Sequence, residues 1–271
     1  MNWFRRYTRD MSLAITVISP EGIVVAADSR LTVTVENQLA DGNKAIIPNY
    51  YDNAVKVLNL TKPHNYVVAT TYGAGTIGQR TAHSYLKEFQ ATLGERRLST
   101  KSFAQKLLDF YKQQWDGVPH GENDDKLYFQ VAGIDASELY GEAYLITIPS
   151  DTIPQVLIPR GAFSFAWGGQ TETVFRIAKG YDALIEKELN DSDLTVANKE
   201  TVLNILNSKE LNLPVHLYSL QDCIDLARFL IDSTSKAQAL SVGIRGVGGS
   251  IDVGCITRHK EFWFISRKEL R

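Results

Sequence analysis

Short apolar runs, each bounded by turn residues, open the chain. Residues 12–19 (SLAITVIS) and 22–29 (GIVVAADS) are rich in β-branched side chains and flank a Pro-Glu-Gly turn. Nearly continuous apolar runs of this length are typical of strands covered on both faces of a sheet. Residues 55–60 and 65–72 repeat the pattern around a second turn. The chain is therefore predicted to begin with two β-hairpins.

The stretch between these hairpins, residues 31–53, is polar and contains Asp-Gly and Pro-Asn pairs. Such pairs punctuate loops. We expect a strand end here, followed by a long surface loop inserted over residues 34–53.

The rest of the chain alternates between groups of helices and groups of strands. Apolar residues recur at three- and four-residue spacing in five segments, 75–95, 98–118, 170–189, 193–209 and 219–240. Strand-like runs lie at 126–169 and 250–267. This order predicts an α+β fold in which helices cover sheets, and it lacks the strict alternation of a doubly wound parallel fold. Residues 186–217 are expected to form an insertion with a solvated helix-loop-helix.

Composition narrows the class of protein. The chain has 271 residues, 44% of them hydrophobic, and a formal net charge of -2. This balance is that of a globular protein and gives no support for a nucleic-acid partner. No apolar run approaches the roughly 20 residues of a membrane span, and no signal-peptide core follows the first residues. We predict a cytoplasmic protein with no membrane partner.

Cysteines and histidines give no metal-binding pattern. Cys223 and Cys255 lie far apart without CxxC spacing, and the five histidines are scattered. Neither arrangement favours a zinc site or a disulfide framework. We expect no metal and no cofactor.

The first hairpin carries the most informative polar residues, Ser12 and Asp28. A loop with an odd number of residues places them on one face, with Cβ atoms about 5 to 8 Å apart. A two-residue turn places them on opposite faces. A serine hydroxyl needs a base to act as a nucleophile, and this hairpin contains no histidine.

An N-terminal serine would supply its own base, because its α-amine has an ordinary pKa near ~8. A nearby lysine would keep that amine neutral by like-charge repulsion, and an aspartate would anchor the lysine. Met11-Ser12 resembles a translation start. We therefore divide the chain into an N-terminal extension or propeptide, residues 1–11, and one domain, residues 12–271.

Six motifs follow one another along the chain: SLAITVISPEGIVVAADSR, VKVLNL, VVATTYGAG, FQVAGID, FAWGG and VGGSIDVGCITR. This ordered series resembles the proteasome β-subunit and bacterial HslV-like family of the Ntn-hydrolase superfamily. The resemblance implies a four-layer αββα sandwich, rings that enclose a chamber, and a nucleophile at the mature N-terminus. It also implies unfolded polypeptide substrates, a homo-oligomeric ring and an ATPase unfoldase as a further partner.

The same resemblance assigns candidate catalytic residues. Ser12 aligns with the family's N-terminal threonine, Asp28 with the aspartate that orients the catalytic lysine, and Gly73 with the oxyanion donor. The lysine is Lys56 by strand context or Lys44 by ungapped counting. We prefer Lys56, because the family lysine begins a strand.

Other positions depart from the family pattern. Gly168 stands where the family has a supporting serine, and Ile244 and Val247 stand where it has an Asp-x-x-Ser pair. Three functions therefore stay open: a threonine-peptidase relative with a serine nucleophile, a catalytically inactive structural subunit of the same fold, and a small-molecule amidase of the Ntn superfamily.

Each candidate residue also has a purely structural interpretation. Ser12 is then a strand-entry residue, Asp28 a partner of Arg30 or of backbone amides, and Lys56 a half-buried strand lysine whose ammonium reaches solvent. Gly73 is then a position that needs unusual backbone angles.

Overall fold

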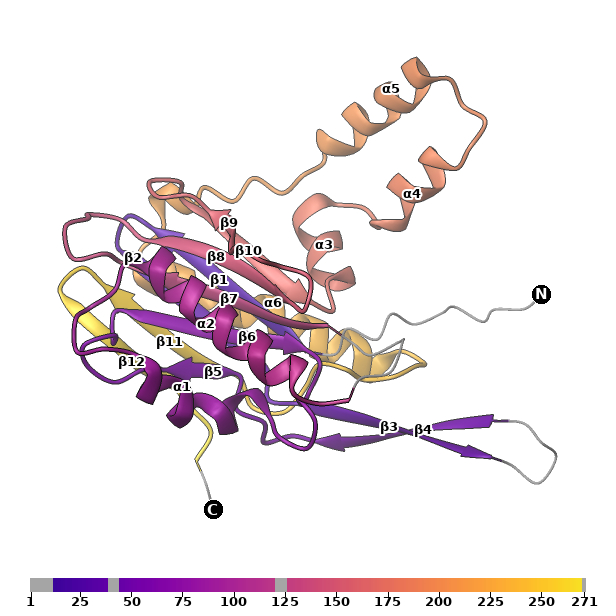
Figure 1. Ribbon diagram of the computed structural model, residues 1–271. Coiled ribbons are helices and arrows are strands. Elements are labelled where there is room, and N and C mark those ends of the chain that lie inside the picture. The colour runs from indigo at the N-terminus through magenta and orange to yellow at the C-terminus, as the bar shows by residue number, and fades with distance from the viewer. Residues whose placement is uncertain (1–11, 39–43, 120–125, 270–271) are drawn as a thin grey trace.

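The computed structural model describes residues 12–38, 44–119 and 126–269 (Figure 1). The predicted N-terminal extension, residues 1–11, lies outside the described residues. The same holds for residues 39–43, 120–125, 270 and 271.

Two five-stranded antiparallel sheets form the body of the molecule (Figure 1). The first has the order β10-β1-β2-β11-β12, with β1 (Leu13–Ser19), β2 (Gly22–Ala27), β10 (Ser164–Gly169), β11 (Asp252–Thr257) and β12 (Lys260–Ser266). The second has the order β5-β6-β7-β8-β9, with β5 (Val57–Asn59), β6 (Val67–Gly73), β7 (Leu127–Gly133), β8 (Glu142–Ile148) and β9 (Gln155–Ile158). Both expected hairpins, β1–β2 and β5–β6, are present.

Helices lie against both sheets. The 3-10 helix η1 (Ala82–Tyr85), α1 (Leu86–Thr92) and α2 (Thr100–Asp116) lie on the second sheet, and α6 (Leu220–Leu240) lies on β1 and β2. The short helix α3 (Glu172–Lys179) packs against α6, with η2 (Val215–Leu217) beside β1 and β10. Helix α6 begins with a capping box, in which Ser219 and Asp222 satisfy each other's backbone N–H groups.

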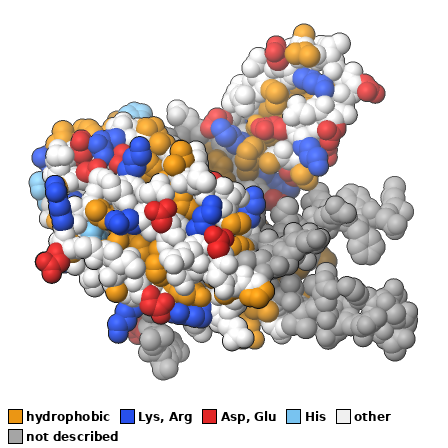
Figure 2. Space-filling model, viewed as in Figure 1, with side chains coloured by type: hydrophobic (Ala, Val, Ile, Leu, Met, Phe, Trp, Pro, Cys, Tyr) orange, Lys and Arg blue, Asp and Glu red, His pale blue; other side chains and the backbone are white. Residues whose placement is uncertain are grey.

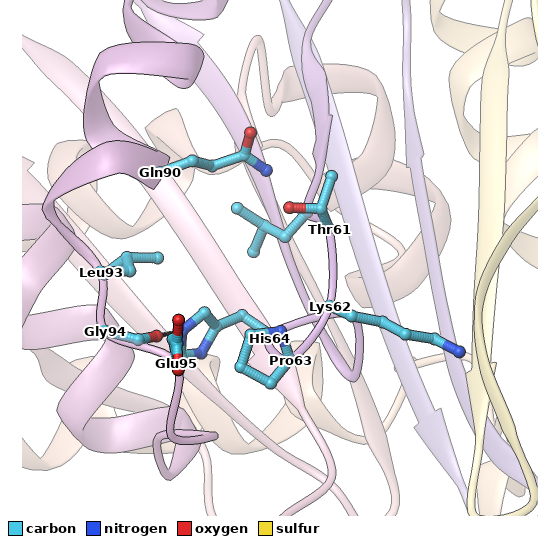
Figure 3. Close-up of a pocket in the computed structure, with 9 residues that line it drawn as sticks. Thr61, Lys62, Pro63, His64, Gln90, Leu93, Gly94 and Glu95 are labelled. Atoms are coloured by element: carbon cyan, nitrogen blue, oxygen red, sulfur yellow. Dashed lines mark hydrogen bonds between the residues drawn. The ribbon is translucent and has the colours of Figure 1, made fainter.

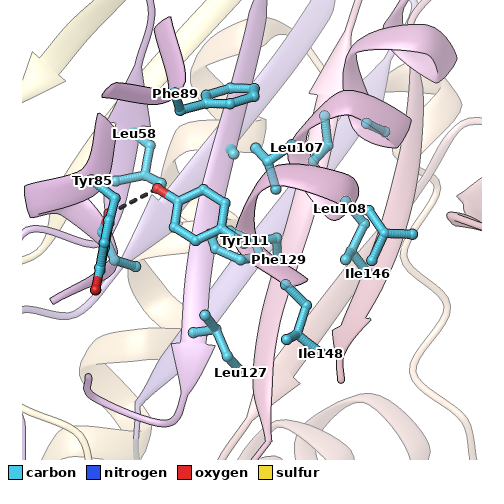
Figure 4. Close-up of a cluster of buried hydrophobic side chains, with 14 of the residues drawn as sticks. Leu58, Tyr85, Phe89, Leu107, Leu108, Tyr111, Leu127, Phe129, Ile146 and Ile148 are labelled. Atoms are coloured by element: carbon cyan, nitrogen blue, oxygen red, sulfur yellow. Dashed lines mark hydrogen bonds between the residues drawn. The ribbon is translucent and has the colours of Figure 1, made fainter. Parts of the chain in front are cut away.

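Hydrophobic packing explains this arrangement. One buried cluster joins α1 and α2 to the second sheet, and in it the Tyr111 hydroxyl donates to the Ala82 carbonyl at 2.8 Å (Figure 4). A second cluster joins α6 to the first sheet. A third, with Ile18, Val25 and Val68, lies where the two sheets meet. Strands β1 and β2 are buried along their whole length, as their continuous apolar sequence predicts.

The prediction of a long surface loop after β2 is wrong. Residues 31–38 and 44–51 form a ribbon of two paired strands, β3 (Leu31–Gln38) and β4 (Lys44–Tyr51), which extends away from the body in Figure 1. Its pairing runs from Leu31 with Tyr51 to Gln38 with Lys44. The sequence LTVTV alternates apolar and polar residues, a two-residue period that favours a strand more than its Asp-Gly pair favours a loop.

A helical arm projects from the other side of the molecule (Figure 1). It comprises α4 (Leu184–Asn190) and α5 (Val196–Asn207), and neither of these described helices buries a residue. Figure 2 shows hydrophobic and charged side chains side by side on its surface. Apart from the first two residues of α4, the arm lies within the insertion expected at residues 186–217.

The predicted fold class, a four-layer αββα sandwich of the Ntn-hydrolase type, is corrected by these observations. The described chain is mainly antiparallel sheet with some helices, and its twelve strands include the separate β3–β4 ribbon. The ribbon and the arm belong to no sandwich layer. Both come from segments that the family comparison treated as insertions, so the resemblance carried no information about them.

Candidate functional site at the end of the first hairpin

Asp28 is the centre of the site. It follows β2 directly, is 1% exposed, and accepts four hydrogen bonds. Its Oδ1 accepts the Leu13 N–H at 2.9 Å and Lys56 Nζ at 2.8 Å. Its Oδ2 accepts the Gly248 N–H at 3.0 Å and the Arg30 N–H at 3.1 Å. A buried carboxylate needs such donors, and here they come from four separate segments of the chain.

Lys56 lies just before β5 and points at Asp28. Its ammonium donates to Asp28 Oδ1 and to the Arg30 carbonyl, at 2.8 and 2.5 Å. The residue is only 6% exposed. Burial lowers the pKa of Lys56 from its ordinary value, although Asp28 favours the charged form; Lys268 and Arg30 lower that pKa further. The ammonium is therefore buried, whereas the purely structural interpretation of Lys56 expected it to reach solvent.

Lys44, the alternative lysine, begins β4 opposite Gln38 in the ribbon. The ion pair between Lys56 and Asp28 favours Lys56 as the lysine of this site.

Ser12 stands just before β1 in an unusual backbone conformation. Its φ is 106°, the one positive value recorded among non-glycine residues in the described part of the chain. Its N–H donates to the Gly246 carbonyl at 3.1 Å, and its carbonyl accepts the Gln170 N–H at 2.8 Å. A β-carbon at positive φ costs on the order of 1 to 3 kcal/mol, which the surrounding contacts must offset.

The odd-loop geometry proposed for Ser12 and Asp28 is not the one formed. Ser19 pairs with Gly22, so Pro20 and Glu21 make a two-residue turn. That register places residues 12 and 28 on opposite faces of a regular hairpin. The positive φ takes Ser12 out of the pleat, and Asp28 reaches the neighbouring Leu13 N–H with its side chain.

Gly73 ends β6 with φ +83°. A Cβ there would lie 2.3 Å from the Lys126 carbonyl oxygen and 2.7 Å from the Tyr128 ring. Only glycine fits this conformation and this close approach. The structural interpretation of Gly73 is therefore sufficient to explain the residue.

A small cavity of about 40 Å³ brings the candidates together. Ser12, Lys56 and Gly73 line it, with Thr71, whose buried Oγ1 lacks a protein partner in the described structure. Asp28 lies behind Lys56. The four candidates thus converge from the starts or ends of strands in both sheets.

The departures from the family pattern have visible consequences. A side chain at Gly168 would overlap the Tyr72 ring, because its Cβ would come within 2.1 Å of Tyr72 Cζ. Val247 is fully buried, and its N–H donates to Gln238 Oε1 at 2.9 Å. Ile244 is half-buried. These three positions supply no side-chain hydroxyl or carboxylate to the site.

Backbone groups of the glycine-rich segment 246–249 contact the site instead, and these contacts were not predicted from the sequence. The Gly246 carbonyl accepts from Ser12, and Gly248 donates to Asp28 and accepts from Ser29. A Cβ at Gly248 would lie 2.4 Å from the Arg30 guanidinium carbon. The high glycine content of RGVGGS was the available signal for this close packing.

The two cysteines are poor alternatives as nucleophiles. Both are buried and free. Burial raises the pKa of Cys223 and raises that of Cys255 to about 12, so both thiols stay protonated near neutral pH.

Another hollow, of about 150 Å³, lies between the β5–β6 turn and the end of α1 (Figure 3). Lys62, His64, Gln90 and Glu95 line it, and His64 shares a hydrogen bond with the Gly94 carbonyl. It has no lining residue in common with the Ser12 cavity.

Comparisons with known proteins place the fold. Neither the protein-family models nor the curated proteins include a match. The similar solved structures include the helical assembly of the Anbu complex from Pseudomonas aeruginosa and a Gly-1 mutant of Anbu from Hyphomicrobium sp. strain MC1. For the first, the TM-score is 0.53 at 15% identity, over 95% of this chain and 88% of that one. For the second, the TM-score is 0.54 at 15% identity, over 94% and 87%.

These neighbours correct the family resemblance. Both are Anbu structures, so the predicted membership of the proteasome β-subunit and HslV-like family is wrong. At 15% identity the likeness shows the fold alone, which is Anbu-like. Within the described residues, no group of acidic, histidine or cysteine side chains could hold a metal ion. None of the described helices is both long and apolar enough to cross a membrane.

Proposed function

We propose that the chain is a peptide-bond hydrolase that uses Ser12 as an N-terminal nucleophile. The observation that carries the proposal is the convergence of Ser12, Lys56 and Gly73 on one cavity, with Asp28 paired to Lys56 behind it. The proposal requires the Met11–Ser12 bond to be hydrolysed, so that Ser12 has a free α-amine.

The positive φ of Ser12 supports cleavage at this bond. A side chain at positive φ is crowded by the carbonyl of the preceding residue. Cleavage removes that carbonyl, so it relieves the strain while the Gly246 and Gln170 contacts continue to hold residue 12.

In the proposed reaction, Ser12 Oγ attacks the substrate carbonyl carbon, and the hydroxyl proton passes to the Ser12 α-amine. The nearby Lys56 ammonium keeps that amine neutral beforehand by like-charge repulsion. The oxyanion accepts the Gly73 N–H, a contribution of roughly 3 kcal/mol in comparable sites. The α-amine then protonates the leaving nitrogen as the C–N bond breaks, and water hydrolyses the resulting ester by the reverse route.

We further propose that the chain works as an oligomer on unfolded polypeptides. The solved neighbour is itself described as a helical assembly, which supports an assembled form. Cytoplasmic location and an ATPase unfoldase are expectations from the sequence alone.

A second candidate is a non-catalytic subunit of the same fold. Gly168 and Val247, which supply no polar side chain to the site, favour it. An active-site phosphonylation experiment separates the two. A peptide fluorophosphonate is incubated with the full chain, so that the reactive hydroxyl displaces fluoride from phosphorus, and the adduct is mapped by mass spectrometry. The proposal predicts one adduct, on Ser12. Absence of an adduct on Ser12 in a preparation with a free Ser12 α-amine supports the non-catalytic candidate.

A further inference from the structure

A second buried ion pair lies directly behind the Asp28–Lys56 pair. Lys268, which follows β12, contacts Asp252 Oδ2 through its ammonium, and its N–H donates to Asp252 Oδ1 at 3.0 Å. The Lys268 side chain is 6% exposed and that of Asp252 is 3% exposed. Taking two charges out of water is costly, so an arrangement this buried requires complete pairing.

Ser29 joins the two ion pairs, because it is the residue next to Asp28. Its Oγ accepts from Lys268 Nζ at 3.0 Å and donates to the Ser250 carbonyl at 2.7 Å. Its N–H donates to the Gly248 carbonyl, and its own carbonyl accepts the Ala54 N–H, two residues before Lys56. Lys268 is therefore bound directly to the segment that carries Asp28, and through Ser29 it is linked to the segment that leads into Lys56.

We infer that Lys268 is a positioning residue for the proposed site, acting on Lys56 through its buried charge and through Ser29. The side chains of Lys268 and Lys56 are 6% and 7% exposed, and like charges repel more strongly in a buried environment than in water. This repulsion lowers the pKa of Lys56, in the same direction as burial does. The pair would thus help to tune the lysine of the site from the segment after β12.

Other charged groups face the same two lysines and must be followed in the test. Asp28, Arg30 and Asp52 act on Lys56. His83 of η1 faces Lys268, and its pKa is lowered by burial and by the charges of Arg267 and Lys268. Loss of the Lys268 charge should therefore raise the pKa of both Lys56 and His83. The histidine provides an internal check that the substitution changed the local field.

The test is an NMR titration of the full chain with 13C-labelled lysine side chains, which reads the pKa of Lys56 without any turnover. The Lys56 signal is assigned from its absence in Lys56→Arg. Lys268→Met should move the Lys56 midpoint to higher pH, and Lys268→Arg, which keeps the charge, should restore it. Lys236→Met is the matched control, because Lys236 pairs with Asp232 on the surface of α6.

Lys268→Met leaves Asp252 buried without its partner, so the single variant can fail to fold. The second variant Lys268→Gln also removes the charge, and its amide N–H can still donate to Asp252 and Ser29. A Lys56 midpoint in either folded variant, Lys268→Met or Lys268→Gln, that stays within the scatter of the Lys236→Met control overturns the inference.

The effect of Lys268 on Lys56 matters for catalysis only if the proposed function is correct. Different results would contradict the inference and the proposed function. If Ser12 is the nucleophile, the pH–rate profile of peptide hydrolysis should move with the Lys56 midpoint in Lys268→Met. A Lys56 shift in a protein that never hydrolyses peptides contradicts the proposed function and leaves the linkage intact. Hydrolysis by Ser12 with an unmoved Lys56 midpoint contradicts the linkage.

Discussion

The neighbourhood of Asp28 and the α4–α5 arm differ completely in burial. Asp28, Ser12 and Lys56 are 1%, 6% and 6% exposed, whereas α4 and α5 bury no residue and Val196 is 73% exposed. Side chains of the first region are held by contacts from several segments. Those of the second depend on local helical structure. Substitutions should therefore have large effects in the first region and small effects in the second.

The largest expected effect is the loss of activity in Ser12→Ala, because the nucleophile is removed. Turnover of an unstructured peptide should fall by about a thousandfold or more. The control is Ser241→Ala, at an exposed serine whose hydroxyl donates only to the Ala237 carbonyl among the hydrogen bonds recorded. Turnover by Ser12→Ala at the wild-type rate would exclude Ser12 as the nucleophile.

The next largest effect is on folding stability in Asp28→Asn. This change removes the charge that pairs with the buried Lys56 ammonium, and breaking one side of a buried pair costs about 3 to 5 kcal/mol. The free energy of unfolding is measured by urea denaturation. Asp193→Asn, in the exposed loop of the arm, should stay within about 0.5 kcal/mol of wild type. Equal effects at the two positions would contradict the contrast between the regions.

Gly73→Ala should destabilise the protein by roughly 2 kcal/mol or more, from positive φ and from overlap with the Lys126 carbonyl. Gly161→Ala is a matched control, since Gly161 has φ +80° but no atom within 4 Å of the Cβ position. It carries the backbone strain alone, about 1 kcal/mol. If urea denaturation shows the same loss of stability in both variants, the overlap with the Lys126 carbonyl does not contribute to the cost of Gly73→Ala.

A smaller effect concerns the pH dependence of stability through Lys56. Its folded pKa lies below the ordinary 10.5, so between these values the unfolded chain binds more protons than the folded one. Stability from this lysine therefore increases as pH rises through that window. Relative to Lys56→Met, the wild type should gain stability from neutral pH toward 10.5 in urea denaturation. If the stability of wild type relative to Lys56→Met declined over that range, the pKa of Lys56 would not be lowered in the folded state.

The smallest effect is expected in the arm. Val196→Ser removes an exposed apolar side chain from the start of α5 and should change the free energy of unfolding by less than about 0.5 kcal/mol. A larger loss of unfolding free energy that depends on protein concentration would show that the arm packs against a second copy of the chain. The arm would then no longer serve as the exposed region in this comparison.

Patterns local in sequence predicted much of the fold. The apolar runs predicted β1, β2 and β6, and helical spacing predicted α2 and α6, because burial on one or two faces leaves a direct periodic record. The β3–β4 ribbon was missed because Asp-Gly outweighed its alternating pattern. The family resemblance named the wrong family and fold class, because the short motifs that carried it did not distinguish the Anbu-like fold.

The site was only partly predictable for a different reason. Asp28, Lys56 and Gly73 lie in sequence motifs that can be recognised at or beside predicted strands, so their candidate roles could be stated in advance. The positive φ of Ser12 and the backbone groups of Gly246 and Gly248 depend on contacts with residues more than 150 positions away. Glycine carries no side-chain chemistry to signal such contacts, and the Lys268–Asp252 pair joins residues that no motif connects.

The most direct test of the central claim is the intact mass and N-terminal sequence of protein expressed from the full reading frame and assayed for peptide hydrolysis. The account predicts that the active protein begins with Ser12, so that the hydroxyl and the α-amine belong to the same residue. An active protein that retains residues 1–11 would contradict it, because Ser12 would then have no free α-amine to act as base.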